Sequence, residues 1–399
     1  MNNAPEETDN REASATAEIS IEQRETEGLS QGQIVRRRFF RHRGAVVSMI
    51  VLAFIVVLSF TSVGIDLWGI RIPGWWQYDW RQIPPIENRG VPTLSLIPEF
   101  LGGAGLAFGN HPFGQDEVGR DTFAVVMRGA QQSLMVMVIA GVVATAIGVV
   151  IGAVAGYYRK AADAVLMRFT DIIITIPLIV IGAVLGNALG NLGAAVLGVV
   201  IGLFAWTTLA RLVRGEFLTL REREFVDAAR VSGARDRRII FRHILPNAVG
   251  VIVVNATLLM AGAILLESAL SFLGFGVVSP DTSLGKIVSD NQAAFSTRPW
   301  LFWWPGIFII TIALCVNFIG DGLRDAFDPR QKKMPSERAM ARAGRSSTPA
   351  GPVQDAGAAG PASVTVAGEA VYTGDVENYH DPRPEEPGDA GHGRLDPER

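Results

Sequence analysis

Charged residues and cysteines are scarce in this chain of 399 residues. Only 19% of the residues are charged and 49% are hydrophobic, whereas roughly a quarter of a soluble domain is charged. This deficit favours a membrane protein over a soluble domain with a large apolar core. The one cysteine, Cys315, lies in an apolar run and excludes an internal disulfide. The five histidines are scattered along the chain without the spacing of metal ligands.

A nucleotide-binding loop is also missing from the sequence. A phosphate-cradling loop needs a glycine, four residues, and then Gly-Lys-Ser/Thr. The Gly285–Lys286 pair has Pro280 in place of the first glycine and is followed by Ile287. We therefore expect this chain to bind no cofactor and no metal, and to have no catalytic residues. The arginines cluster beside apolar runs instead of forming a basic face, which argues against a nucleic-acid partner.

Apolar runs long enough to cross a hydrocarbon core of ~30 Å are abundant. The first covers residues 45–65 and follows the arginine-rich segment 36–44 directly. Five more lie near 133–156, 172–190, 194–213, 248–275 and 304–323. Basic residues before the first run and after the last place both ends of the chain in the cytoplasm. The sequence predicts an all-α membrane protein with six transmembrane helices, embedded in membrane lipid.

The composition divides the chain into five parts. Polar, Pro- and Gly-containing ends with few apolar residues cannot bury a core, so both ends are expected to be disordered in the cytoplasm. The predicted parts are a disordered N-terminus at 1–35, the first transmembrane helix at 36–66, an extracytoplasmic loop at 67–130, a core with five transmembrane helices at 131–328, and a disordered tail at 329–399. A cytoplasmic loop at 214–247 interrupts the core.

This loop contains a charged segment of helix-favouring residues. Residues 222–232 favour a helix, and Gly233 stands where a left-handed residue would end it. Pro246 fits the first turn of the fifth span, where its missing N–H is not needed. Ala228 and Ala229 leave a slim helix face that a groove of another protein could approach. From the residues alone, a docking loop and an ordinary basic loop are equally compatible with the pattern.

Four polar residues lie in or near the apolar runs. Glu267 is either an ion-paired or hydrogen-bonded residue near the end of the fifth span, or a residue that gates or lines a pathway. Asn255 and Asn317 are expected to form interhelical hydrogen bonds. Asp321 is expected to pair locally or with residues 157–171 at the cytoplasmic surface.

The stretch "DAARVSGARDRRIIFRHILP" at 227–246 resembles the cytoplasmic signature of bacterial ABC importer permeases. Asp227 stands where that family has Glu, and His243 stands where it usually has Ile, although a His before "ILPN" is typical of the dipeptide/oligopeptide branch. Segments 111–134, 156–177, 265–288 and 317–330 are similar to the same branch, in order and with compatible spacing. The resemblance therefore covers about 36–330.

The resemblance implies a type I ABC importer permease fold in the bacterial cytoplasmic membrane. Such a chain forms a heterodimer with a second homologous permease, binds two cytoplasmic ABC ATPase subunits that hold ATP and magnesium, and receives substrate from an extracytoplasmic binding (lipo)protein. Residues 224–246 would form a helical hairpin that couples the chain to an ATPase. The implied coupling residues are Glu224, Asp227, Ala228, Ala229, Gly233, His243, Leu245 and Pro246.

Alternatives from two other classes, and other substrates, remain open at this point. Nickel, glutathione and other small solutes are carried by the same branch, but no span has the cluster of histidines or acids that would favour a metal over a peptide. A non-transporting receptor or scaffold would share the six spans without needing an Ala-Ala-Gly docking helix. An intramembrane protease would need two facing aspartates, for which Asp171 and Asp321 are the weak candidates.

Overall fold

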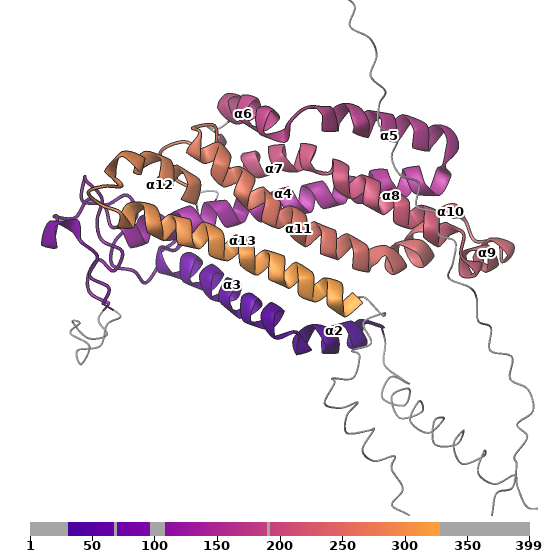
Figure 1. The fold of residues 1–399 in the computed structure, drawn as a ribbon, viewed down its shortest axis with the longest axis horizontal. Helices are drawn as coiled ribbons and strands as arrows, with labels where there is room; N and C mark the ends of the chain where they lie inside the picture. Colours follow the sequence, from indigo (N-terminus) through magenta and orange to yellow (C-terminus); the bar gives the residue numbers. More distant parts are fainter. Residues whose placement is uncertain (1–30, 68–69, 96–107, 190–191, 328–399) are drawn as a thin grey trace, which may run out of the picture. The chain divides into compact units, whose positions relative to one another are not determined.

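The computed structural model describes residues 31–67, 70–95, 108–189 and 192–327. These residues are helical (Figure 1), apart from loops and one short antiparallel hairpin of β1 (Ile65–Leu67) and β2 (Ile70–Ile72). The sequence did not predict this hairpin. The predicted disordered tail at 329–399 lies outside the described residues, as does residue 328. The predicted boundary of the disordered N-terminus, at residue 35, is wrong, because residues 31–35 already belong to helix α2 (Gln31–Arg41).

Four helices are long and apolar enough to cross a membrane by themselves. They are α3 (Arg43–Ser62), α4 (Thr122–Tyr158), a continuous helix from Asp236 to Phe272, and α13 (Trp300–Phe327). Two further crossings are possible if each of two bent helix pairs is one span. The pairs are α5 (Lys160–Thr175) with α6 (Leu178–Leu189), and α7 (Ala194–Ala205) with α8 (Thr207–Arg221). The described residues thus hold four to six spans, and the upper number matches the prediction.

Only one of the two bends coincides with a proline. Helices α5 and α6 are bent by 75° at Pro177. Proline cannot donate a helical hydrogen bond and moves the preceding residue out of the helical region, and Ile176 is extended with φ −87° and ψ 120°. Helices α7 and α8 are bent by 47° at Trp206, which keeps helical angles. The apolar runs predicted the spans but not the bends.

Glycines allow α4 to approach α7 and α8 closely. A Cβ added at Gly152 would come within 2.5 Å of the Ala210 carbonyl oxygen of α8. A Cβ added at Gly202 of α7 would lie 2.9 Å from the Ala140 carbonyl oxygen of α4. Side chains of any size would separate these backbones, and close packing is what holds helices together in lipid.

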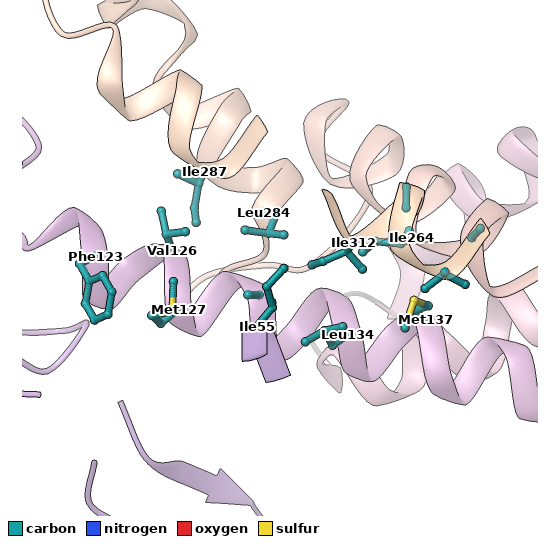
Figure 2. Packing of buried hydrophobic residues seen from close by; sticks show 14 of the residues in the cluster. Ile55, Phe123, Val126, Met127, Leu134, Met137, Ile264, Leu284, Ile287 and Ile312 are labelled. Carbon is teal, nitrogen blue, oxygen red and sulfur yellow. The ribbon is translucent and has the colours of Figure 1, made fainter. Parts of the chain in front are cut away.

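The largest buried apolar cluster joins α3, α4, α13, α11 (Leu245–Phe272) and α12 (Leu284–Asp290). Figure 2 shows Ile55, Leu134, Ile264, Leu284 and Ile312 within it, one from each of these helices. All five side chains are at most 5% exposed. Helices far apart in the sequence are thereby fixed against one another, with the first span included in the core.

The loop between α3 and α4 is tied to the start of α4 through Asp121. This residue caps the helix by accepting the Ala124 N–H at 2.9 Å and also accepts the Trp76 indole N–H at 2.8 Å. Its other oxygen lies 2.8 Å from His111 Nδ1. Burial raises the pKa of the Asp121 carboxyl, although the hydrogen bonds from His111, Ala124 and Trp76 act in the opposite direction. This network of hydrogen bonds orders the loop against the start of α4.

Candidate functional site

The candidate site is the segment 224–246, which connects α8 to the fifth span and which we call the hairpin. It contains α9 (Glu224–Val231), the single turn α10 (Asp236–Arg238) and the π-helical turn η4 (Ile239–Ile244), and then continues into α11. In Figure 1, α9 and α10 lie together at one end of α8 and α11. Two short arms joined by a tight turn are what the sequence predicted.

The turn of the hairpin depends on Gly233. Its φ of +75° is left-handed, a conformation that costs other residues about 1–2 kcal/mol. The Gly233 N–H bonds to the Arg230 carbonyl at 2.9 Å, and the Ala234 N–H bonds to the Ala229 carbonyl at 3.0 Å. These two bonds form a Schellman motif, which satisfies the last carbonyls of α9. The predicted left-handed cap at Gly233 is confirmed.

Pro246 lies in the first turn of α11, as the sequence predicted, although α10, η4 and α11 follow one another without a break. The helix runs continuously from Asp236 to Phe272, and Pro246 is an exposed residue inside it. The preceding π-helical turn explains why proline is tolerated. There the Leu245 N–H bonds to the Ile240 carbonyl, five residues back, so the regular pattern of bonds is already shifted where the proline N–H is missing.

The inner face of the hairpin is anchored to the helix bundle. Val226 and Ile244 are completely buried and pack in one apolar cluster with Phe217 of α8 and Tyr157 of α4. The Tyr157 hydroxyl also donates a hydrogen bond of 2.7 Å to Asp236 at the start of the second arm. Both arms are therefore attached to the ends of the spans, so a force applied to the hairpin reaches them directly.

The hairpin carries three exposed apolar side chains, and basic residues lie beside one of them. Phe225, Val231 and Phe241 are 40%, 90% and 62% exposed. Next to Phe241 lies an open hollow of about 430 Å³, lined by that ring and by Arg235, Arg237 and Arg238. Large apolar side chains grouped in a polar surround mark an interaction surface.

The sequence analysis missed these three apolar residues. The signal was available, because Phe225 and Phe241 stand next to the buried Val226 and Ile240 in the sequence and must then point away from the bundle. The family motif indicated the small residues of α9 as the contact surface instead.

The predicted coupling residues fall into two groups. Glu224, Asp227 and Ala228 are exposed on α9, and the two acids lie in its first turn, where they complement the helix dipole. His243 and Leu245 are half-buried in the joint between the hairpin and α11. A partner that contacts the outer face meets the first group, whereas the second group holds the hairpin on its span.

Glu267 lies in the core of the bundle and not at its surface. It is completely buried in this chain, and its two oxygens accept hydrogen bonds of 2.7 Å from the hydroxyls of Ser133 on α4 and Ser271 on its own helix. No basic side chain pairs with it among the described residues. Of the alternatives for Glu267, the interhelical hydrogen bond is confirmed by its contact with Ser133.

The two asparagines behave differently from the prediction. The Asn255 amide donates to the Val251 carbonyl of its own helix at 2.8 Å, so the predicted interhelical hydrogen bond of Asn255 is wrong. A short polar side chain can reach the carbonyl four residues earlier and compete with a bond to another helix. Asn317 is half-buried and forms no side-chain hydrogen bond within the described part of the chain.

The acids at the cytoplasmic ends of the spans have separate environments. Asp171 of α5 accepts a hydrogen bond of 2.6 Å from Arg211 of α8, and Asp163 accepts one of 2.6 Å from Arg214. Asp321 is exposed on α13 and forms no ion pair among the described residues, so its predicted pairing is not found there. Because Asp171 is bonded to arginine, the structure offers no support for a pair of facing aspartates.

Family comparisons agree with this arrangement of spans and hairpin. The family of binding-protein-dependent transport system inner membrane components matches residues 148–333. The N-terminal TM domain of oligopeptide transport permease C matches residues 30–83. The first match contains the hairpin and the last spans, and the second contains α2, α3 and the β-hairpin.

Individual relatives cover most of the chain. The oligopeptide transport system permease protein OppC of Haemophilus influenzae is 36% identical, over 78% of this chain and 93% of its own length. The protein of the same name from Mycobacterium tuberculosis is 34% identical, over 77% of this chain and 98% of its own. A structure of the inward-facing MetNI methionine ABC transporter is 19% identical with a TM-score of 0.42, over 51% of this chain and 96% of that one.

The matches to the two permeases extend over nearly their whole lengths, and they include the first span as well as the core. In this chain, the sequence pattern of the family thus folds into a bundle of four to six spans with an ordered hairpin. The chain is a multi-pass inner-membrane protein, and it belongs to the OppC family of binding-protein-dependent transport permeases.

Proposed function

We propose that this chain is the permease subunit of an ATP-driven importer that moves di- or oligopeptides across the cytoplasmic membrane. The observation that carries the proposal is the hairpin, whose inner face is buried against two spans while Val231 and Phe241 are exposed on its outer face. A membrane protein gains nothing from an ordered, exposed apolar surface in water unless another molecule covers it. The peptide substrate is inferred from the names of the relatives.

The partner at the hairpin is an ABC ATPase. ATP and magnesium are bound by a pair of such ATPase subunits, and this chain acts as a transport subunit without catalytic residues of its own. Closure of the ATPase pair displaces the hairpin and shifts the spans between inward-facing and outward-facing arrangements. Such a change is a rigid-body transition whose two states are biased by ATP and by the loaded binding protein.

A second, homologous permease completes the pathway in this proposal. Helix α5 supports the need for a further subunit, because Val165, Phe169 and Ile172 form an exposed apolar stripe at helical spacing. In a membrane this stripe contacts lipid or a neighbouring helix bundle. An extracytoplasmic binding protein delivers the peptide on the opposite side from the hairpin.

The first experiment tests the hairpin as the ATPase contact. The chain is purified with its partners in mild detergent, as wild type and as the double variant Val231→Ser/Phe241→Ser. We expect the double variant to lose at least nine-tenths of the retained ATPase, because both exposed apolar side chains are removed without a change in charge. The matched control is Ile83→Ser/Val118→Ser, which removes apolar residues of similar exposure, 62% and 57%, from the extracytoplasmic loop. Full retention of ATPase by the hairpin variant would refute the docking site.

The second experiment tests the substrate. The assembled complex is reconstituted in proteoliposomes with its binding protein, and uptake of a labelled tripeptide and a labelled pentapeptide is measured with and without ATP. We expect the wild-type complex to take up at least one of the two peptides in an ATP-dependent manner, and the hairpin variant to show no such uptake. If ATP-dependent uptake of nickel or glutathione is found instead, the importer stands and the peptide substrate is wrong.

A further inference from the structure

Helix α2 presents an aromatic ring and several arginines on the surface next to the first span. Phe40 is 56% exposed, whereas its neighbour Phe39 is 9% exposed. Arg36, Arg41 and Arg43 are all exposed. Phe40 stands three residues before the start of α3 at Arg43, so its ring lies close to where the chain enters the membrane.

The orientation of α2 is fixed by its inner face. Phe39 packs with Ala45 of α3 and with Ala326 of α13 in a small buried cluster, and Figure 1 shows α2 beside the end of α13. The His42 ring accepts the Ala45 N–H at 3.0 Å through Nδ1, and its Nε2 lies 3.5 Å from Asp325 of α13. With one face held in this way, α2 cannot turn Phe40 toward the protein.

The charges of Arg36, Arg41 and Arg43 on the outer face are not balanced by any residue that the structure describes. Arg36, Arg41 and Arg43 form no ion pair within the part of the chain that the structure describes. Guanidinium groups bind phosphates with paired hydrogen bonds and keep their charge at any physiological pH. Aromatic rings are favoured at the level of lipid headgroups, and basic residues beside a span attract anionic lipids.

We propose that α2 is a binding site for anionic phospholipid headgroups of the cytoplasmic leaflet. Arg36, Arg41 and Arg43 bind the lipid phosphate and anionic headgroup, and Phe40 inserts at the boundary between headgroups and acyl chains. The site anchors the first span at a fixed depth and rotation, because α2 is itself packed on α13. The proposal does not depend on the import of peptides, since it needs only the membrane location of the chain.

The test measures lipid preference of the purified full-length chain. Fluorescent phosphatidylglycerol and phosphatidylcholine are titrated separately into the protein in mild detergent. We expect wild type to bind phosphatidylglycerol more tightly, and the variant Arg36→Gln/Arg41→Gln/Arg43→Gln to lose this preference. Each basic residue contributes about fivefold to the attraction, so the ratio of the two affinities falls on the order of 100-fold for three arginines. Phe40→Ser weakens binding of both lipids and leaves their ratio unchanged.

The matched control changes the same charge elsewhere. Arg235→Gln/Arg237→Gln/Arg238→Gln removes three exposed arginines from the hairpin, and we expect it to retain the lipid preference. Equal loss in both triple variants would reduce the effect to net charge and overturn the site, and so would an unchanged preference in the α2 variant that elutes as a folded protein. Displacement of the lipid by excess inorganic phosphate would show a free-anion site and would also overturn the proposal.

Discussion

Glu267 is a buried acid in a helix bundle, and no basic side chain in the described part of the chain pairs with it. Its burial is tolerated because serine hydroxyls from two helices satisfy its oxygens, and a buried acceptor that keeps its donors avoids most of the cost of desolvation. This arrangement favours a role in joining α4 to α11 over a role in the pathway.

Substitution of Glu267 distinguishes the two roles. We expect Glu267→Ala to lower the free energy of unfolding by about 1–3 kcal/mol, because it leaves the Ser133 and Ser271 hydroxyls without an acceptor, while Glu267→Gln keeps most of the stability. Thermal unfolding in lipid nanodiscs measures both. A Glu267→Gln variant of normal stability that no longer transports would show that the carboxylate acts in the pathway after all.

Gly233 sets a prediction about the hairpin turn. A Cβ at this position meets no atom within 4 Å, so the only penalty of Gly233→Ala is the left-handed backbone, about 1–2 kcal/mol. We expect amide hydrogen exchange in α9 to become about tenfold faster, with larger effects for the β-branched Gly233→Val. Gly233→Asn serves as the control, since Asn tolerates this conformation. Equal exchange in all variants would contradict the role of the cap.

The residue scale also shows what a sequence cannot specify. The span residues were identified as polar and hydrogen-bonded, and Glu267 has the expected interhelical bond. Asn255 bonds to its own helix instead, because the choice between two acceptors depends on which face of the helix meets a neighbour. That choice is made by packing and has no signal in the residue type.

Among the elements, the bent pair α5–α6 is attached to the rest of the bundle partly by ion pairs. Its first half is held to α8 by the ion pairs Asp163–Arg214 and Asp171–Arg211. The side chains of the first pair are 20% and 34% exposed, and those of the second are 48% and 44% exposed. Solvent screens the more exposed pair more strongly, so the two pairs differ in strength.

A double-mutant cycle measures that difference. We expect a coupling free energy of up to about 1 kcal/mol for Asp163 with Arg214, and less for the Asp171–Arg211 pair. The exchange Asp163→Arg/Arg214→Asp should restore part of the stability that either single change removes. The cycle is measured by chemical unfolding at low and at high salt. Coupling that does not decrease with salt would contradict the electrostatic origin.

At the level of helices, some local sequence features predicted the structure and others did not. Apolar length located the four helices that can cross a membrane by themselves and the two bent pairs, and Pro177 marks the bend between α5 and α6 in the sequence. The bend at Trp206 has no such mark, since its backbone remains helical. Likewise, Pro246 marked the first turn of α11, but it gave no sign that a π-helical turn, whose Ile239 and Ile244 are buried, leads into that helix.

For the whole molecule, the number of membrane crossings decides where every loop lies. With six crossings, the turn between α6 and α7 is extracytoplasmic and the hairpin is cytoplasmic. If the bent pairs were re-entrant, both would lie on the same side. Leu192 in that turn and Ser232 in the hairpin are exposed reporters of the two positions.

Cysteine labelling in intact cells tests the six-span arrangement. The native thiol of Cys315 is 6% exposed and is removed by Cys315→Ala. We expect Leu192→Cys to react with a membrane-impermeant maleimide in intact cells, and Ser232→Cys to react only after the cells are opened. Protection of Leu192→Cys in intact cells would establish four crossings and two re-entrant pairs.

The continuous helix from Asp236 to Phe272 has a mechanical consequence. Its 37 residues make a rod of ~55 Å at the usual rise of a helix, with one end in the hairpin and the other near the buried carboxylate. Within this rod the π-helical turn is the one irregular stretch, and it is clamped by buried isoleucines. A push or twist applied at the hairpin is therefore transmitted along the rod with little loss, as far as the turn in which Glu267 is hydrogen-bonded to Ser133 of α4.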